Sequence, residues 1–153
     1  MGWHSGDIEM ARQALVVDAS VVVKWFSAEG EAYVSQAVEI MEGHVSDEIA
    51  IVMPDLLYYE VANALVHKKA FSDKEIQFSL QSLFHLGLNS FPVDADLMGM
   101  SAELARKLKI TIYDACYAAR ARSENIPLVT ANPRHQMHGL GCEVIPLEQW
   151  GKR

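Results

Sequence analysis

The sequence has little that would suit an exported or membrane-embedded protein. Its 153 residues include two cysteines, Cys116 and Cys142, too few for a disulfide framework. Free thiols in the reducing cytoplasm are therefore expected. The long apolar run from Ala14 to Val23 contains Asp18 and falls far short of the ~20 residues that span a membrane. No basic region followed by an apolar core marks residues 1–10 as a secretory signal.

Positive charge is also scarce. Lys and Arg together number 13 against 20 Asp and Glu, and the formal net charge is −7. A protein that binds nucleic acid through phosphate contacts alone is expected to be basic. If this chain acts on RNA, it must use a local group of cations together with a metal ion, and not its overall charge.

Half of the residues are hydrophobic, no repeat or low-complexity linker is visible, and the length suits one domain. We expect a loose extension over residues 1–13 and a single domain over residues 14–150. Short apolar runs predict strands at Ala14–Val17, Ala50–Met53, Ser90–Val93, Leu128–Thr130 and Glu143–Ile145. Helical patterns lie between them, at Ser20–Phe26, Glu31–Glu42, Asp55–Lys69 (entered through Pro54), Ser72–Leu86, Asp94–Leu108 and Thr111–Ser123.

This alternation indicates an α/β fold, a three-layer sandwich around a mainly parallel sheet of four or five strands. In such folds the ligand site lies beyond the carboxyl ends of the strands. Residues that directly follow Val17 and Thr130 are therefore the first candidates for a site.

Three carboxylates stand alone in apolar sequence. Asp18 follows the first predicted strand, Glu60 lies inside a predicted helix, and Asp114 lies near the start of the last one. Burying such a group is costly unless it is paired, protonated or bound to a metal. Three of them in one domain favour a shared acidic site.

Each carboxylate also has a plainer interpretation. Asp18 suits the N-cap of the helix that follows it, and Asp114 completes a capping box with Thr111. Glu60 has no capping role, so its plain interpretation is an exposed position or an ion pair with Lys68 or Lys69. It shares a helix face with Leu56, Asn63, Ala64 and His67, which looks like the edge of a core or a cleft.

Four segments, in this order, resemble the PIN-domain ribonuclease family. They are Val16–Ser20 with Lys24–Phe26 and Glu29, then Pro54–Leu65, Thr111–Ala119 and Pro127–Asn132. The resemblance covers about Leu15 to Leu147. It implies a parallel sheet with acidic residues converging at one end, binding of Mg²⁺ or Mn²⁺, and cleavage of RNA. Small prokaryotic members of this kind are often toxins, so it also implies a small antitoxin partner and a homodimer or higher homo-oligomer.

By the same resemblance, Asp18, Glu60 and Asp114 are the metal-site carboxylates. The family usually has a fourth acid where this chain has Asn132, which predicts weaker metal binding. We expect Asp18 and Asp114 to hold the ion and Glu60 to orient or deprotonate the attacking water. Supporting roles are expected for Ser20, Asn63, Thr130 and Asn132. Candidate RNA contacts are the cations Lys24, Arg120, Arg122 and Arg134, with Trp25 and Tyr113 as candidate stacking residues.

Other interpretations stay open at this stage. A catalytically degenerate PIN fold that binds RNA or protein is the main alternative, favoured by Asn132 and the negative charge. An aspartate-nucleophile phosphatase would need an acid where Ser20 stands, and no Gly-rich loop suits a phosphate-binding NTPase. His135, His138 and Cys142 have residue types that suit zinc, but exposed loop positions are the preferred interpretation of all three.

Overall fold

The computed structural model describes residues 13–136 and 138–152. The expected N-terminal extension, Gln13 apart, therefore lies outside the described residues. The described part confirms the predicted α/β class. It contains a parallel sheet of five strands in the order β3-β2-β1-β4-β5.

The central strands are apolar because both faces of the sheet are covered. β1 (Ala14–Val17) and β4 (Leu128–Thr130) match the predicted strands residue for residue, and both are almost wholly buried. β2 (Ala50–Pro54) and β5 (Val144–Pro146) each extend one residue beyond the prediction. β3 (Asn89–Phe91) ends before Pro92, which cannot donate a hydrogen bond to a neighbouring strand.

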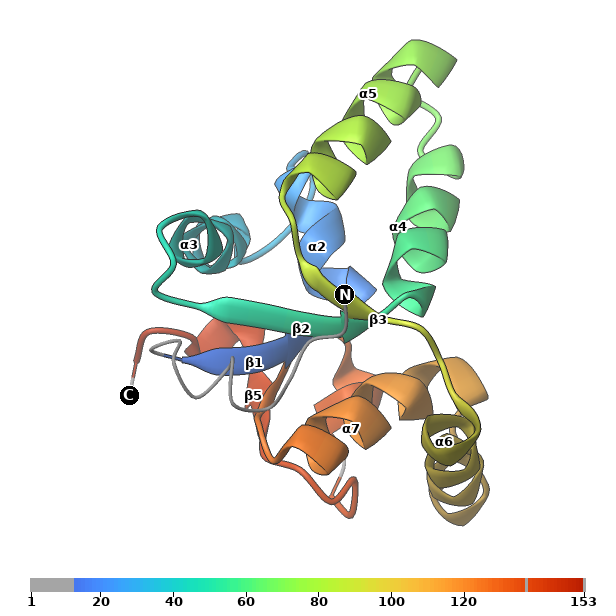
Figure 1. Ribbon diagram of the computed structural model, residues 1–153. Coiled ribbons are helices and arrows are strands. Elements are labelled where there is room, and N and C mark those ends of the chain that lie inside the picture. The colour runs from blue at the N-terminus through green and yellow to red at the C-terminus, as the bar shows by residue number, and fades with distance from the viewer. Residues whose placement is uncertain (1–12, 137, 153) are drawn as a thin grey trace.

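Figure 1 shows helices on both faces of this sheet. One layer holds α2 (Ala19–Val22), the 3₁₀ turn η1 (Val23–Trp25), α3 (Val34–Val45) and α4 (Leu56–Val66). After α4, α5 (Asp73–His85) extends away from the sheet. The other layer holds α6 (Ala95–Leu108) and α7 (Ile112–Glu124), with α7 packed against β1 and β2. Short turns η2 (Pro133–Gln136) and η3 (Leu147–Gln149) complete the order.

Two predicted helix starts are wrong. The helix expected from Glu31 begins at Val34, because Tyr33 before it has a left-handed backbone with φ 59°. Pro54 was expected in the first turn of a helix, but it is the last residue of β2, and Asp55 precedes α4. The predicted helix Ser20–Phe26 is divided into α2 and η1.

Capping residues set the other helix starts as predicted. Ser72 and Glu75 form a reciprocal capping box at α5, and the Asp94 side chain accepts from Leu97 N at α6. Thr111 accepts from Asp114 N at α7, which ends at the left-handed Asn125. Among the described residues, no helix is long and apolar enough to cross a membrane.

The register of the sheet brings two predicted site segments together. Val17 of β1 pairs with Val129 of β4, so Asp18 and Thr130 come next to each other at the carboxyl edge. α7 passes below this edge and carries Asp114 on its first turn. The fold therefore places the polar residues that follow Val17 and Val129 in one location.

Candidate active site

Asp18 is the most deeply buried carboxylate of the site, with 2% of the residue exposed. It ends β1 and is also the N-cap of α2, where its side chain accepts from Ser20 N at 3.1 Å. The capping interpretation of Asp18 is thus confirmed, and it does not exclude a role of the same carboxylate in a site. A four-residue helix does not by itself explain a buried charge, so the other contacts of Asp18 matter more.

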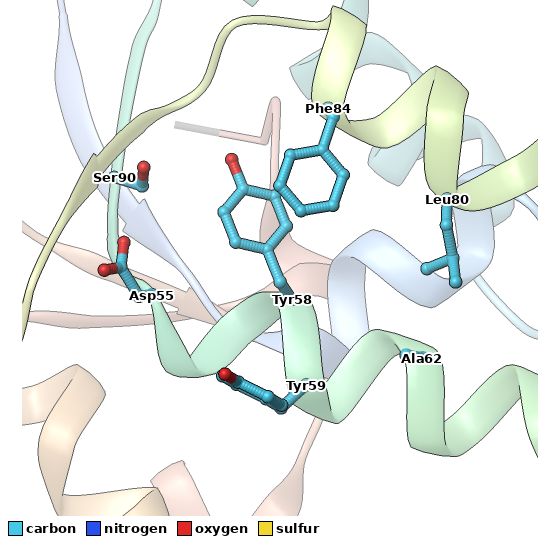
Figure 2. Close-up of a pocket in the computed structure, with 7 residues that line it drawn as sticks. All are labelled: Asp55, Tyr58, Tyr59, Ala62, Leu80, Phe84 and Ser90. Atoms are coloured by element: carbon cyan, nitrogen blue, oxygen red, sulfur yellow. The ribbon is translucent and has the colours of Figure 1, made fainter.

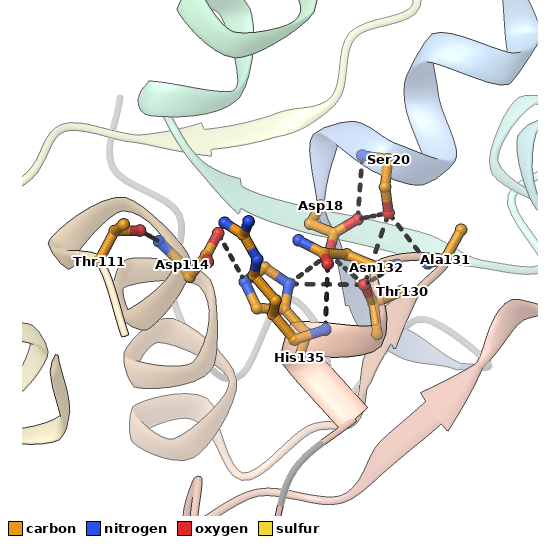
Figure 3. Close-up of polar contacts among 9 residues, drawn as sticks. Asp18, Ser20, Thr111, Asp114, Thr130, Ala131, Asn132 and His135 are labelled. Atoms are coloured by element: carbon orange, nitrogen blue, oxygen red, sulfur yellow. Dashed lines mark hydrogen bonds and ion pairs between the residues drawn. The ribbon is translucent and has the colours of Figure 1, made fainter. Parts of the chain in front are cut away.

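Two hydroxyl groups hold the Asp18 carboxylate, as Figure 3 shows. The Ser20 hydroxyl donates to Oδ1 and the Thr130 hydroxyl donates to Oδ2, both at short range. Each hydroxyl is held in turn by a backbone amide. Ala131 N donates to Ser20 at 2.9 Å, and Asn132 N donates to Thr130 at 2.9 Å. The supporting positions predicted for Ser20 and Thr130 therefore agree with the geometry.

His135 is the residue that the sequence analysis missed. It was expected to be exposed, but it is 1% exposed, and its ring lies between two of the carboxylates. Nδ1 lies 2.5 Å from Oδ2 of Asp18, and Nε2 lies 3.0 Å from Oδ1 of Asp114. The second contact is an ion pair without the alignment of a good hydrogen bond. Burial lowers the pKa of His135, but the hydrogen bonds and charges of Asp18 and Asp114 outweigh it and raise the pKa above 6.5.

The other two residues of the zinc interpretation do not join His135 in a site. His138 is exposed, as expected, and Cys142 is half-buried. Burial raises the pKa of the Cys142 thiol to about 11, which disfavours the thiolate that zinc would need. A zinc site at His135, His138 and Cys142 is not supported.

Asp114 and Glu60 approach the same place from α7 and α4. The Asp114 side chain is 13% exposed and its carboxylate turns to His135. Burial raises the pKa of Glu60, the nearby Tyr117 hydroxyl lowers it in part, and the charges of Asp114 and Asp18 raise it further. The plain interpretation of Glu60 as a partner of Lys68 is not supported, because Lys68 pairs with Glu31 at 3.2 Å. The charges of Asp114 and Asp18 therefore both act on Glu60.

Asn132 has a clear structural role beside the site. Its side-chain oxygen accepts from Arg134 N at 3.0 Å, and its carbonyl accepts from His135 N at 3.0 Å. It thereby holds the start of η2, the turn that carries His135. Asn63 is exposed on α4, and no contact joins it to these residues in the described part of the chain.

Two of the four predicted RNA-binding cations are not free at the surface. Lys24 is 7% exposed and pairs with Glu31 at 2.8 Å, and Arg120 pairs with Glu124 at 3.3 Å and covers the ring of Phe91. Both charges already have a partner within the fold, and an RNA contact for either of them stays a prediction. Arg122 and Arg134 are exposed. Of the candidate stacking residues, Tyr113 is 56% exposed, whereas half-buried Trp25 donates to Ala37 O.

The donor chemistry of the site suits a hard divalent cation. Carboxylate oxygens are the ligands that Mg²⁺ and Mn²⁺ prefer, and Asp18, Asp114 and Glu60 provide them. Burial and, after it, the charges of Asp114 and Asp18 raise the pKa of Glu60, and a bound cation would offset the repulsion between these charges. In the described residues, however, no three His, Cys, Asp or Glu side chains already converge around one point. Asp18 and Asp114 face the two sides of His135 instead.

A second hollow lies between α4 and α5, away from these carboxylates (Figure 2). It has a volume of about 600 Å³ and is lined by Asp55, Tyr58, Tyr59, Ala62, Leu80, Phe84 and Ser90. Tyr58 and Phe84 stack with ring centroids 4.1 Å apart. Its lining is aromatic and aliphatic with one carboxylate, so it suits an apolar side chain and lacks a set of reacting groups.

Comparisons with known proteins agree with this geometry. The family model described as PIN domain matches residues 15–138. Ribonuclease VapC1 of Mycobacterium tuberculosis is 30% identical over 133 residues, which cover 84% of this chain and 94% of that protein. The crystal structure of PAE2754 from Pyrobaculum aerophilum has a TM-score of 0.62 at 21% identity and covers 90% of this chain and 92% of its own. A toxin–antitoxin complex from Klebsiella pneumoniae has a TM-score of 0.61 at 19% identity, covering 87% and 97%.

Proposed function

The chain belongs to the PIN domain family, and we propose from this premise that it is a metal-dependent endoribonuclease that hydrolyses phosphodiester bonds of RNA. The observation that carries the proposal is the buried Asp18 carboxylate at the carboxyl edge of the sheet. Asp114 and Glu60 come from two other elements to the same place. Among the relatives, Ribonuclease VapC1 is named for this activity.

Membership of the family implies a divalent metal, and we propose Mg²⁺ or Mn²⁺. Asp18 and Asp114 would hold the ion, since each presents a carboxylate at the carboxyl edge. When bound, such an ion stabilises charge on the phosphate and lowers the pKa of a water molecule. Glu60 would suit a general base toward an attacking water, because burial raises its pKa above the ordinary value of a glutamate. Ser20 and Thr130 keep Asp18 in place through their hydroxyl groups.

RNA would be held by few protein cations. The exposed Arg122 and Arg134 remain the proposed contacts, and the exposed ring of Tyr113, next to Asp114, is the proposed stacking surface. With a net charge of −7, the protein is expected to bind RNA weakly without metal. This favours a loop or a single strand, whose bases are accessible for stacking, over a long duplex that would be held through its phosphates.

We propose a small antitoxin as the protein partner, and a homodimer or higher homo-oligomer. The Klebsiella pneumoniae relative is described as a toxin–antitoxin complex. On this chain, α4 and α5 expose Tyr59, Val66, Phe78 and Phe84, and large apolar residues grouped at a surface mark protein interfaces. Cys116 and Cys142 are both free, which supports the cytoplasm as the location.

A binding module without catalytic activity is the second candidate. It is favoured by Asn132, which brings no charge where the family usually has an acid. Metal-dependent cleavage separates the two candidates, because a binding module would retain RNA and leave it intact.

The deciding experiment incubates the full chain with a mixed pool of structured RNAs in Mg²⁺, in Mn²⁺ and in EDTA. Cleavage in either metal and none in EDTA is expected. Asp18→Asn is expected to lower the rate by about 100-fold or more, as loss of a metal-site group typically does. Asparagine also caps helices well, so circular dichroism should show the variant folded.

Asp73→Asn is the matched control, since Asp73 is an exposed aspartate in the first turn of α5. It should cleave like the wild type. If folded wild-type protein binds the RNA pool but cuts none of it in either metal, the binding module replaces the ribonuclease as the conclusion.

A further inference from the structure

We propose that His135 closes the metal site in the metal-free protein by occupying the space between Asp18 and Asp114. The carboxylate oxygens that face the ring, Oδ2 of Asp18 and Oδ1 of Asp114, can then share a divalent ion only after the imidazole has withdrawn. This inference rests on the proposed metal-dependent function and assigns to His135 a positioning role, not a catalytic one.

The contacts of the ring are the first argument. Each ring nitrogen faces a different carboxylate, at 2.5 Å from Asp18 and at 3.0 Å from Asp114 (Figure 3). Two oxygen ligands of one magnesium ion lie no more than about 4 Å apart, since each is roughly 2.1 Å from the ion. The two contacts and the ring between them separate the contacted oxygens by more than this. Asp18 and Asp114 therefore cannot share an ion through these oxygens while His135 stays in place.

Burial is the second argument. His135 is 1% exposed, so its ring fills space at the centre of the site and does not rest on the rim. One edge lies against the ring of Tyr117, with centroids 6.0 Å apart, and Nδ1 also lies 3.4 Å from the Thr130 hydroxyl. The ring adds a partner to the buried Asp18 carboxylate, which Ser20 and Thr130 also hold, and gives the partly buried Asp114 carboxylate an ion pair.

The third argument is the element that carries the residue. Asp18 lies at the junction of β1 and α2, and Asp114 lies on α7, but His135 lies on η2, outside the sheet. η2 is a single 3₁₀ turn that starts from the Asn132 hydrogen bonds. The imidazole can therefore leave by rearrangement of this turn or of its own side chain, while the strands and helices that hold the carboxylates remain.

The test is calorimetric titration of the full chain with Mn²⁺, for the wild type, His135→Ala and His138→Ala. If the open site is populated to about one-tenth in the wild type, removing the imidazole tightens the apparent Kd by about tenfold. His138 is exposed three residues further along, so His138→Ala should leave the Kd unchanged. In EDTA, His135→Ala should also melt at a lower temperature than the wild type. Addition of Mn²⁺ should raise the melting temperature of the variant by more than it raises that of the wild type.

The outcomes separate this inference from the proposed function. Weaker Mn²⁺ binding by His135→Ala would identify His135 as a metal ligand, and equal binding would identify it as a structural residue. Either result would overturn the closing role of His135 and leave the proposed metal site in place. No binding by either folded protein would overturn the metal site itself and with it the metal-dependent ribonuclease.

A second measurement uses only the wild type and does not depend on the folding of a variant. Nuclear magnetic resonance of ¹⁵N-histidine-labelled protein follows the ring nitrogens during titration with Mg²⁺. Loss of the carboxylate contacts should move the His135 ring signals, and the His138 signals should stay. Saturation with Mg²⁺ while the His135 signals remain unchanged would overturn the proposal.

Discussion

Asp18 and His135 are polar residues that are 2% and 1% exposed, whereas Tyr59 and Phe78 are aromatic residues that are 77% and 70% exposed. The first pair lies at the carboxyl edge of the sheet, and the second pair lies on α4 and α5, which extend away from it (Figure 1). Both regions depart from the usual distribution of polar and apolar side chains, in opposite directions.

The two regions differ in whether their unusual side chains have partners within the chain. At the sheet edge, the Asp18 carboxylate has internal partners in Ser20, Thr130 and His135, so its burial is compensated within the chain. On the helices, the rings of Tyr59 and Phe78 lie largely in water. The polar region therefore depends on its own hydrogen bonds for stability, and the apolar region has surface left for another molecule.

The largest effect on stability is expected from Thr130→Val. This change keeps the shape of a fully buried side chain but removes the hydroxyl that donates to Asp18 and accepts from Asn132 N. Leaving a buried group without its partner costs about 1–3 kcal/mol of unfolding free energy. Urea denaturation in EDTA would measure it.

Ser35→Ala is the control, because the Ser35 hydroxyl is exposed and contacts only the neighbouring Gln36 side chain at 2.8 Å. It should change the free energy by no more than about 0.5 kcal/mol. Equal effects of the two substitutions would mean that the hydroxyl network does not support the buried carboxylate.

Much of the fold was predictable because its core strands are short and, Thr130 apart, apolar. β1 and β4 were placed to the residue, and the caps Ser72, Asp94 and Thr111 marked their helices. The start of α3 was not predictable, because Tyr33 is an unusual residue for a left-handed backbone and no glycine or asparagine marks the position. The local sequence pattern therefore does not predict the left-handed conformation of Tyr33.

The candidate site was predictable where isolated charge stood in apolar sequence, as at Asp18, Glu60 and Asp114. His135 could not be found in this way, because it lies in a short polar turn and not in an apolar segment. The available signal was its position only five residues after Thr130, the last residue of β4, and therefore close to the carboxyl edge of the sheet. Lys24 shows the same signal for a cation: apolar residues flank it on both sides, its side chain is buried, and Glu31, seven residues later in the sequence, is its ion-pair partner.

A pH titration of stability is the next test of the polar region. Contacts with Asp18 and Asp114 raise the pKa of His135 against the opposing effect of burial, and burial raises the pKa of Glu60. Groups with raised pKa values in the folded state stabilise it below their ordinary values, and this contribution is lost as pH rises through the folded values. The melting temperature in EDTA should therefore fall as pH rises through a window that starts at about pH 6.5, the ordinary pKa of histidine.

Glu31 acts in a different pH range and with the opposite sign. Its contact with Lys24 lowers the pKa of Glu31, so its contribution to stability is lost only as pH falls below about 4.5 and does not overlap this window. His135→Ala should flatten the decline, and His138→Ala should not. A melting temperature that rises over this window would contradict the assigned partners of His135.

The smallest effect on stability is expected from Tyr59→Ser. The side chain is 77% exposed, so its loss should change the unfolding free energy by no more than about 0.5 kcal/mol. Its effect on association should be larger, because an exposed aromatic beside the Tyr58–Phe84 stack suits the apolar centre of an interface. Sedimentation velocity over a range of protein concentrations would compare self-association of the variant and the wild type.

Tyr113→Ser provides the contrast, since Tyr113 is also an exposed tyrosine, at 56%, but lies on α7 beside Asp114. If α4 and α5 form the interface between copies, Tyr59→Ser should weaken self-association while Tyr113→Ser leaves it intact and affects RNA binding instead. A loss of more than about 1 kcal/mol of unfolding free energy in Tyr59→Ser would show that this ring stabilises the single chain. The two regions would then differ only in polarity, and the exposed rings would no longer argue for a partner.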